Sequence, residues 1–179
     1  MTLAYYRRAA RPEDAFGILC TYRDSLRDAD PQPYPEATLD AMAPAAIPPA
    51  WLHWLTGRIR RGSEETVVVF AHDGALAGFG SVLPRRSLLQ AVYVAPAPLV
   101  RGVGAMILEA AERMAAVGGT AVLSTHAPPS AEGFFAGAGY VAVGRGRQPV
   151  GGGLDLPATI MVKPLGAVAS FAALAAAGA

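Results

Sequence analysis

The stretch VYVAPAPLVRGVGAMILEA, Val92 to Ala110, joins a β-branched run, a loop with two prolines and a long segment with apolar residues at helical spacing. Gly102 and Gly104 stand where the loop meets the helix. The first N–H groups of a helix lack intrahelical partners, and the helix dipole adds partial positive charge there. The junction therefore suits an anion such as phosphate. The same glycines would also serve a tight strand-to-helix turn, and this alternative stays open.

Two common phosphate-binding motifs are excluded in this stretch. The dinucleotide fingerprint needs a third glycine where this chain has Ile107, and the P-loop needs a Gly-Lys-Ser/Thr sequence that is absent. What remains is a short Gly-x-Gly loop at the start of a helix.

Composition limits the class of protein. The chain has 179 residues, 53% hydrophobic and 16% charged, which is typical of one globular domain. A net charge of +1 gives no electrostatic reason to expect a nucleic acid or an anionic membrane as partner. The single cysteine, Cys20, excludes an intramolecular disulfide, and no Cys/His cluster has metal spacing, so we expect no metal.

The two ends of the chain suggest where the protein is found. The N-terminal residues lack the apolar core of a signal peptide, so we expect a cytoplasmic and, from the dominance of arginine, bacterial protein. Residues 166–179 are rich in alanine, and at about 14 residues they are shorter than the ~20 that span a bilayer. We expect this tail to pack on the body or on a second subunit of a homodimer, or to remain a frayed end.

Strand and helix patterns alternate irregularly along the chain. The expected strands are Ala4–Ala9, Thr66–Ala71, Leu76–Pro84, Ser87–Ala95, Thr120–His126 and two that flank residues 151–153, the last near Ala158–Val162. The expected helices begin at Pro12, Glu36, Pro49, Gly102 and Ser130. In the helix from Pro49, Trp51, Trp54, Leu55 and Ile59 are predicted to form one apolar stripe. This order indicates an α+β fold whose sheet carries helices on both faces.

Beyond these patterns, the chain resembles the GNAT superfamily of N-acetyltransferases. The stretch VYVAPAPLVRGVGAMIL is similar to the family's central motif, in which a strand leads into a glycine loop and the long helix. RPEDA resembles its opening, TVVVFAHDGALAGFGSV its central hairpin and SAEGFFAGAGY its late helix. The resemblance implies a single GNAT-like domain over residues 1–165, with a mixed, mostly antiparallel sheet of about seven strands.

The resemblance also implies acetyl-CoA as co-substrate and a set of contacts for it. The pantetheine arm is expected along the backbone of Val92, Tyr93 and Val94, where two central strands splay apart. The phosphates are expected at the helix start, and Phe135 is expected to pack against the coenzyme or in the core. The expected phosphate contacts are Val100, Arg101, Gly102, Val103, Gly104 and Ala105.

Catalytic groups are less clear from the sequence. Phe135 stands where many family members have a tyrosine that acts as general acid. Gln90 replaces an acidic residue of the branch that the chain resembles, and could orient a water or a substrate amide. His126, at the end of its strand, is the candidate general base, since imidazole exchanges protons near neutral pH. Alternatively it is a polar strand-end residue without a catalytic role.

The sequence thus predicts direct transfer of an acetyl group from acetyl-CoA to a primary amine of a small molecule or peptide. The competing interpretation is a catalytically weak or inactive coenzyme-A-binding sensor or interaction module. Three departures from the family support it: the expected tyrosine and acidic residue are missing, and Leu99 stands where the family usually has Gln or Arg.

Overall fold

Seven strands form one sheet in the computed structural model, which describes residues 5–29, 32–96, 102–150 and 153–166. The order across the sheet is β1-β2-β3-β4-β5-β7-β6, and every neighbouring pair is antiparallel except β4 and β5. The strands are β1 (Tyr5–Ala9), β2 (Glu65–Ala71), β3 (Leu76–Leu83), β4 (Leu88–Val94), β5 (Val122–Ala127), β6 (Val141–Val150) and β7 (Leu154–Pro164). The predicted fold class is confirmed.

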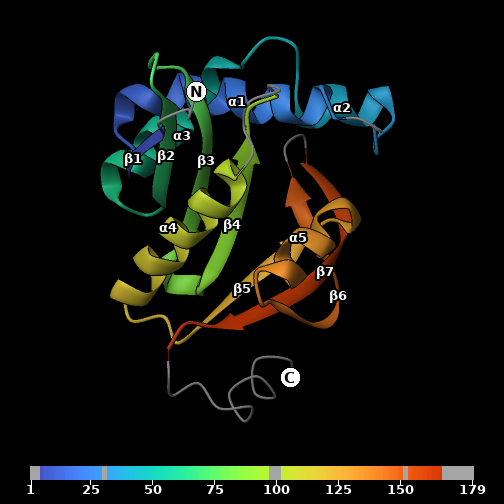
Figure 1. The fold of residues 1–179 in the computed structure, drawn as a ribbon. Coiled ribbons are helices and arrows are strands. Elements are labelled where there is room, and N and C mark those ends of the chain that lie inside the picture. Colours follow the sequence, from blue (N-terminus) through green and yellow to red (C-terminus); the bar gives the residue numbers. More distant parts are fainter. Residues whose placement is uncertain (1–4, 30–31, 97–101, 151–152, 167–179) are drawn as a thin grey trace.

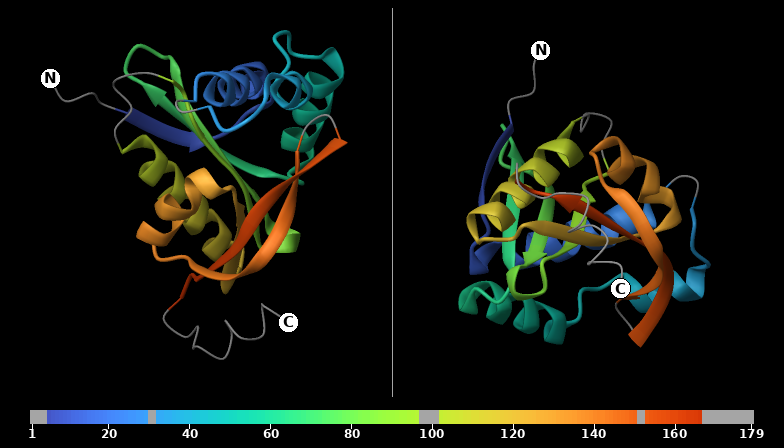
Figure 2. Two further views of the ribbon diagram at one scale, coloured as in Figure 1. Left: turned by 90° about the vertical axis from the view of Figure 1, so that its right-hand side faces the viewer. Right: turned by 90° about the horizontal axis from the view of Figure 1, so that it is seen from below.

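Helices cover both faces of this sheet (Figures 1 and 2). On one face, α4 packs across β2, β3 and β4, and α5 joins it through a shared apolar core. On the other face, α1 packs on β3 and β4, and α3 packs beside α1. The helices are α1 (Ala15–Arg27), α2 (Glu36–Met42), α3 (Pro49–Arg61), α4 (Val103–Val117) and α5 (Glu132–Gly137).

Close packing of α4 on the sheet depends on two glycines of β3. A Cβ atom built on Gly80 would lie 2.5 Å from Ile107 Cγ2, and one on Gly78 would lie 2.7 Å from Ile107 Cδ1. Ile107 is itself fully buried, so neither position has room for a side chain. These two glycines therefore set the distance between the sheet and the helix that begins at the glycine loop.

The predicted apolar stripe of α3 is wrong in one residue. Trp54 is 50% exposed, and the guanidinium of Arg58 lies 4.8 Å from its ring centroid. Leu55 is buried, and Leu52 packs against the same core. Successive residues of a helix are about 100° apart, so the buried face centres on the side of Leu52 and Leu55 and turns away from Trp54. Trp54 therefore lies outside the core, and the guanidinium of Arg58 covers one face of its ring in a cation–π contact.

Two expectations lie outside the described residues. They are the Ala-rich tail, of which only Gly166 is described, and the loop residues Val100 and Arg101. Among the described residues, no helix is both long and apolar enough to span a bilayer.

Candidate functional site

The parallel strands β4 and β5 form a fork. They pair only at Leu88 with Ser124 and at Leu89 with Thr125, and from Ala91 to Val94 strand β4 pairs with β3 alone. Figure 1 shows the two strands diverging from this point. Within the described part of the chain, the backbone of residues 90–94 therefore has a free edge facing the fork. This is the predicted splay between the two central strands.

A β-bulge in β4 marks the start of the fork. Ser81 of β3 pairs with Ala91, and Val82 pairs with Leu89, so Gln90 is an extra residue with no partner in β3. A bulge bends its strand and increases the local twist, which turns β4 away from β5. The side-chain oxygen of Gln90, Oε1, is buried and has no hydrogen-bond partner among the residues that the structure describes. A buried acceptor without a donor favours a polar ligand group or water at this position.

His126 lies on the other arm of the fork. It comes directly after Thr125, the last residue of β5 that pairs with β4, just as Gln90 comes directly after Leu89. Its neighbours Thr125 and Ala127 are buried, and Ala127 belongs to the core beneath α4 and α5. Because side chains alternate along a strand, the partly buried His126 lies on the opposite face of the sheet. The two residues predicted for catalysis therefore stand at the start of the same opening.

Helix α4 begins beside the free edge of β4. Gly102 is its N-cap residue, with φ of +84°, a left-handed conformation that favours glycine. The side chain of Val103 is completely buried and anchors the helix start, while Gly102 and Ala105 are exposed. The first turn contains no acidic residue. The N–H groups of the first helical residues are thus at an accessible, uncrowded helix end, as an anion site requires.

The structure distinguishes the two phenylalanines of α5. Phe135 is 6% exposed and packs edge-on against Phe134 and Tyr140 in the core. Phe134 is 39% exposed, and its ring lies 3.4 Å from the position of a Cβ atom on Gly104. Of the two roles predicted for Phe135, the structure places it in the core. Phe134 is the aromatic residue beside the glycine loop, and sequence reasoning missed it.

The three residues predicted on the free edge divide between the two faces of the sheet. Val92 and Val94 pack against the core beneath α4. Tyr93 packs against the core on the α1 face and stacks on Phe79 with ring centroids 5.5 Å apart. Their backbone edge remains free for a ligand that pairs like a strand, whichever way the side chains point.

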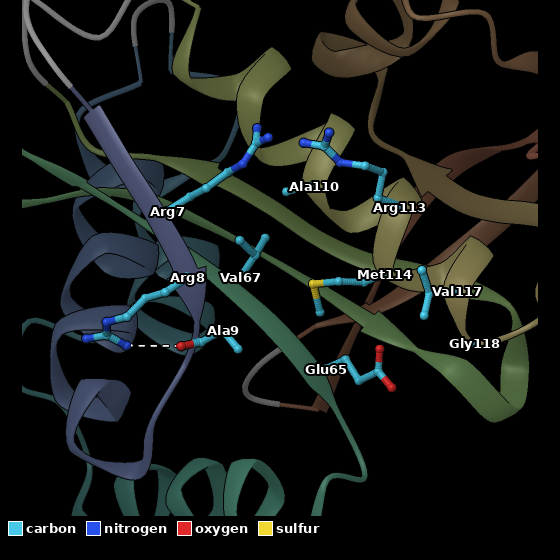
Figure 3. A pocket seen from close by; sticks show the side chains of 10 residues that line it. All are labelled: Arg7, Arg8, Ala9, Glu65, Val67, Ala110, Arg113, Met114, Val117 and Gly118. Carbon is cyan, nitrogen blue, oxygen red and sulfur yellow. Dashed lines mark hydrogen bonds between the residues drawn. The ribbon is translucent and has the colours of Figure 1, made fainter.

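Two further hollows border helix α4. One, of about 430 Å³, lies between β1 and the second half of α4, and Figure 3 shows Arg7 and Arg113 facing each other across it. Both guanidinium groups contact the carboxylate of Glu109, at 3.4 and 3.2 Å. The other, of about 400 Å³, runs between α4 and α5 from Ala105 to Lys163. It begins at the same helix end as the glycine loop. No group of three or more His, Cys, Asp or Glu side chains suited to a metal occurs among the described residues.

Comparison with known protein families identifies the chain. Residues 38–156 match the model of the acetyltransferase (GNAT) domain. The chain belongs to the GNAT acetyltransferase family. This acetyltransferase is therefore an acyltransferase enzyme, and the family predicted from its sequence is confirmed. No curated protein is similar enough in sequence to count as a relative.

Solved structures of this family share the fold of the acetyltransferase. A GCN5-related N-acetyltransferase from Rhodopseudomonas palustris is 26% identical, with a TM-score of 0.71 over 92% of this chain and 98% of the other. A phosphinothricin acetyltransferase from Sinorhizobium meliloti, in complex with acetyl-CoA, is 21% identical, with a TM-score of 0.66 over 93% and 90% of the two chains. The PaiA N-acetyltransferase from Thermoplasma acidophilum, in complex with coenzyme A, is 18% identical, with a TM-score of 0.63 over 90% and 99%.

Proposed function

We propose that this acetyltransferase uses acetyl-CoA and transfers the acetyl group directly to a primary amine of a small molecule or peptide. The observation that carries the proposal is the free edge of β4, residues 90–94, lying beside the glycine start of α4. The structures from Sinorhizobium meliloti and Thermoplasma acidophilum, which contain acetyl-CoA and coenzyme A, add support.

The residues at the fork fit the coenzyme. The backbone N–H groups of Val103, Gly104 and Ala105 would bind the pyrophosphate, since they lie in the first turn of α4. The free edge of β4 would bind the amide groups of the pantetheine arm as an added strand does. Phe134, beside Gly104, would cover the same region from α5. Acetyl-CoA supplies the acetyl thioester on which the reaction depends.

The chain's own polar groups provide the remaining chemistry. An amine must lose its proton before it attacks, because a free alkylammonium has a pKa of about 10.4. His126 would accept this proton directly or through one water. The unpartnered Oε1 of Gln90 would accept a hydrogen bond from the amine and orient it. A thiolate, with a pKa of about 8.5 for its acid, leaves without a general acid, which fits the core position of Phe135.

The test uses the full chain with acetyl-CoA and a panel of primary amines. Release of free thiol, together with an acetylated product found by mass spectrometry, is the expected result. Binding of acetyl-CoA without turnover on any amine would instead favour the coenzyme-binding module. Absence of acetyl-CoA binding would overturn the assignment of the fork. The cytoplasmic location, the domain limits and the absence of metal, nucleic acid and membrane partners stay predictions.

A further inference from the structure

Three buried side-chain oxygen atoms in neighbouring strands lack a hydrogen-bond partner among the residues that the structure describes. They are Thr66 Oγ1 in β2, Ser81 Oγ in β3 and Gln90 Oε1 in β4. Thr66 is 5% exposed and Ser81 is 1% exposed, so bulk solvent does not reach their hydroxyl groups. Buried polar atoms are nearly always hydrogen-bonded, and three exceptions in adjacent strands therefore need a common explanation.

The pairing of the strands brings these three residues together. Thr66 is directly opposite Ser81 across β2 and β3. Ser81 is in turn paired with Ala91, and Gln90 is the extra residue of the bulge, so Gln90 and Ala91 together oppose Ser81. Side chains of directly opposed residues share one face of a sheet, with Cβ atoms about 4.5–5.5 Å apart. Thr66, Ser81 and Gln90 thus form a polar row that leads from β2 to the start of the fork.

The polar row continues an apolar core without being apolar itself. Two residues away along the same face of the strands, Val68 and Phe79 are buried in the core that α1 and α3 cover. Valine at position 66 and alanine at position 81 would fill nearly the same space and leave no polar atom unpaired. The hydroxyl groups of Thr66 and Ser81 therefore indicate a hydrogen-bonding partner other than the described residues.

Water is the smallest partner that fits. The three oxygen atoms do not bond to one another, although their residues are neighbours. At an O–H···O distance of about 2.8 Å, one water can join two oxygens that are up to about 5.6 Å apart. A buried water typically makes about three hydrogen bonds to polar groups that are otherwise unpaired. The polar row offers that number, and the amide oxygen of Gln90 can accept two hydrogen bonds, one from water and one from an amine.

We propose that Thr66 and Ser81 hold an ordered water behind Gln90, and that this water positions the Gln90 side chain for the acceptor amine. The effect on the acceptor rests on the proposed acetyl transfer, whereas the water site does not depend on it. Thr66 and Ser81 are positioning residues, because they act through the water and Gln90. A side chain whose orientation is fixed by a second layer of hydrogen bonds binds its ligand more tightly than a free one.

The water itself can be observed directly. A crystal structure of the full chain, at a resolution that shows ordered water, should place one within about 3.2 Å of both Ser81 Oγ and Gln90 Oε1. Ser81→Ala should also lower the Tm, because it removes a hydroxyl that has a partner. Removal of an unpartnered hydroxyl would leave the Tm unchanged or raise it. A dry site, or a Tm that does not fall, would overturn the proposal whether or not the protein acetylates amines.

Kinetics of matched variants test the role in positioning. The acceptor is the fastest substrate among tyramine, spermidine and a tripeptide with a free N-terminus, at saturating acetyl-CoA. Ser81→Ala and Thr66→Val should each raise the KM for this amine by about 5-fold, the effect of one hydrogen bond, and leave the Kd of acetyl-CoA unchanged. Thr66→Ser, which keeps the hydroxyl, should retain the parent KM. An unchanged KM in both Ser81→Ala and Thr66→Val would contradict the assignment.

A double-mutant cycle shows whether Ser81 acts through Gln90. In a Gln90→Ala background, Ser81→Ala should cause no further rise in KM, because the side chain that it positions is absent. An equal rise in both backgrounds would exclude this route. Thr120→Val is the control, since Thr120 is 9% exposed and precedes β5 at the end away from the fork, and its KM should not change. Turnover of none of the three amines would contradict the proposed acetyl transfer, while the crystal structure would still decide the water site.

Discussion

His126 is the residue on which proton transfer is proposed to depend. If it is the base, His126→Ala lowers kcat/KM by roughly 10²-fold, the lower end of general-base effects. The Kd of acetyl-CoA should stay unchanged, because His126 is not among the residues expected to contact the coenzyme. Steady-state rates and acetyl-CoA titrations of both proteins provide the measurement.

The matched control for His126 is His72→Ala. His72 is exposed in the β2–β3 turn, away from the fork, and its removal should leave the rate unchanged. A kcat/KM that stays the same in His126→Ala would exclude His126 as the base. Catalysis would then depend on proximity and on deprotonation of the amine by solvent.

Gly104 tests the coenzyme site. A Cβ atom built on Gly104 would lie 3.4 Å from the ring of Phe134 and 3.6 Å from the side chain of Val94. Gly104→Ala therefore fits at ordinary contact distance and should still bind acetyl-CoA. Gly104→Glu places a long anionic side chain at the helix end and should abolish the rise in Tm that a ligand of the folded state produces. Normal acetyl-CoA binding by Gly104→Glu would refute the assignment of the phosphate site.

Phe135 and Phe134 allow a comparison of the same substitution at a buried and at a partly exposed position of α5. Phe135→Tyr adds a hydroxyl to a side chain that is 6% exposed, and should lower the free energy of unfolding by about 1–3 kcal/mol without increasing turnover. Phe134→Tyr, at a residue that is 39% exposed, should change stability little. Thermal or urea unfolding of both variants gives the comparison. A more active Phe135→Tyr of normal stability would instead show that a tyrosine at this position can act as a general acid in this chain.

Some single-residue features of the structure could be predicted from the sequence, and others could not. Gly102 and Gly104 were predictable because a glycine loop before a helix is a local pattern. The bulge at Gln90 depends on the pairing of β4 with β3, which no local pattern reveals. The contact between Tyr22 and Tyr93 joins residues 71 positions apart, so it follows from the completed fold alone.

At the scale of elements, an ion pair fixes β1 to the start of α1. The Arg8 guanidinium donates hydrogen bonds to both carboxylate oxygens of Asp14, at 2.6 and 2.8 Å, and the backbone N–H of Arg11 donates a third, at 2.7 Å. The hydrogen bond from Arg8 is the main cause that holds the pKa of Asp14 below its usual value. Folding therefore favours the ionised carboxylate over the protonated acid.

The consequence is a defined pH dependence of stability. Because the pKa of Asp14 is lower in the folded state, its contribution is complete above the unfolded value of about 3.9 and is lost as pH falls through the folded value. Asp14→Asn should lower the free energy of unfolding by about 1–3 kcal/mol at pH 7, and this difference should shrink below about pH 4. Urea unfolding at pH 7 and pH 3 measures it, with the exposed Glu13→Gln as control. A difference that is independent of pH would contradict this origin.

Element boundaries were predictable where they are set locally. The turn at Asp73 and Gly74 joins β2 to β3 as expected, with Gly74 at φ of +84°. Strand β7, however, begins at Leu154, before Pro157, whereas the sequence predicted its start near Ala158. Proline is tolerated there because β7 pairs only with β6 over residues 154–158, and β5 joins at Thr159. A proline normally argues against a strand because it has no N–H to donate. At Pro157 one edge of β7 has no partner strand, so the missing N–H breaks no pairing on that edge.

At the scale of the whole molecule, the fold class was predictable because the order of elements and the family motifs agree. The side of the fork opposite α4 was not predictable, because it combines α1 and β4, which are distant in the chain. The proposed coenzyme side is built from one continuous stretch, β4 and α4, and from α5. A site made by neighbouring elements is visible in a sequence, whereas a site made by distant ones needs the fold.

The fork also determines how cooperatively the protein unfolds. The strands β1–β4 and β5–β7–β6 share only two pairs of backbone partners, so the backbone couples these halves of the sheet weakly. Side chains link the two halves more strongly. Val82 and Leu89 of the first half share one core with Leu123 of the second, and Leu108 and Ala111 of α4 pack in the same core. A ligand that lies along β4 and contacts both arms would add a second link. Occupancy of the fork would then make the two halves melt as one unit.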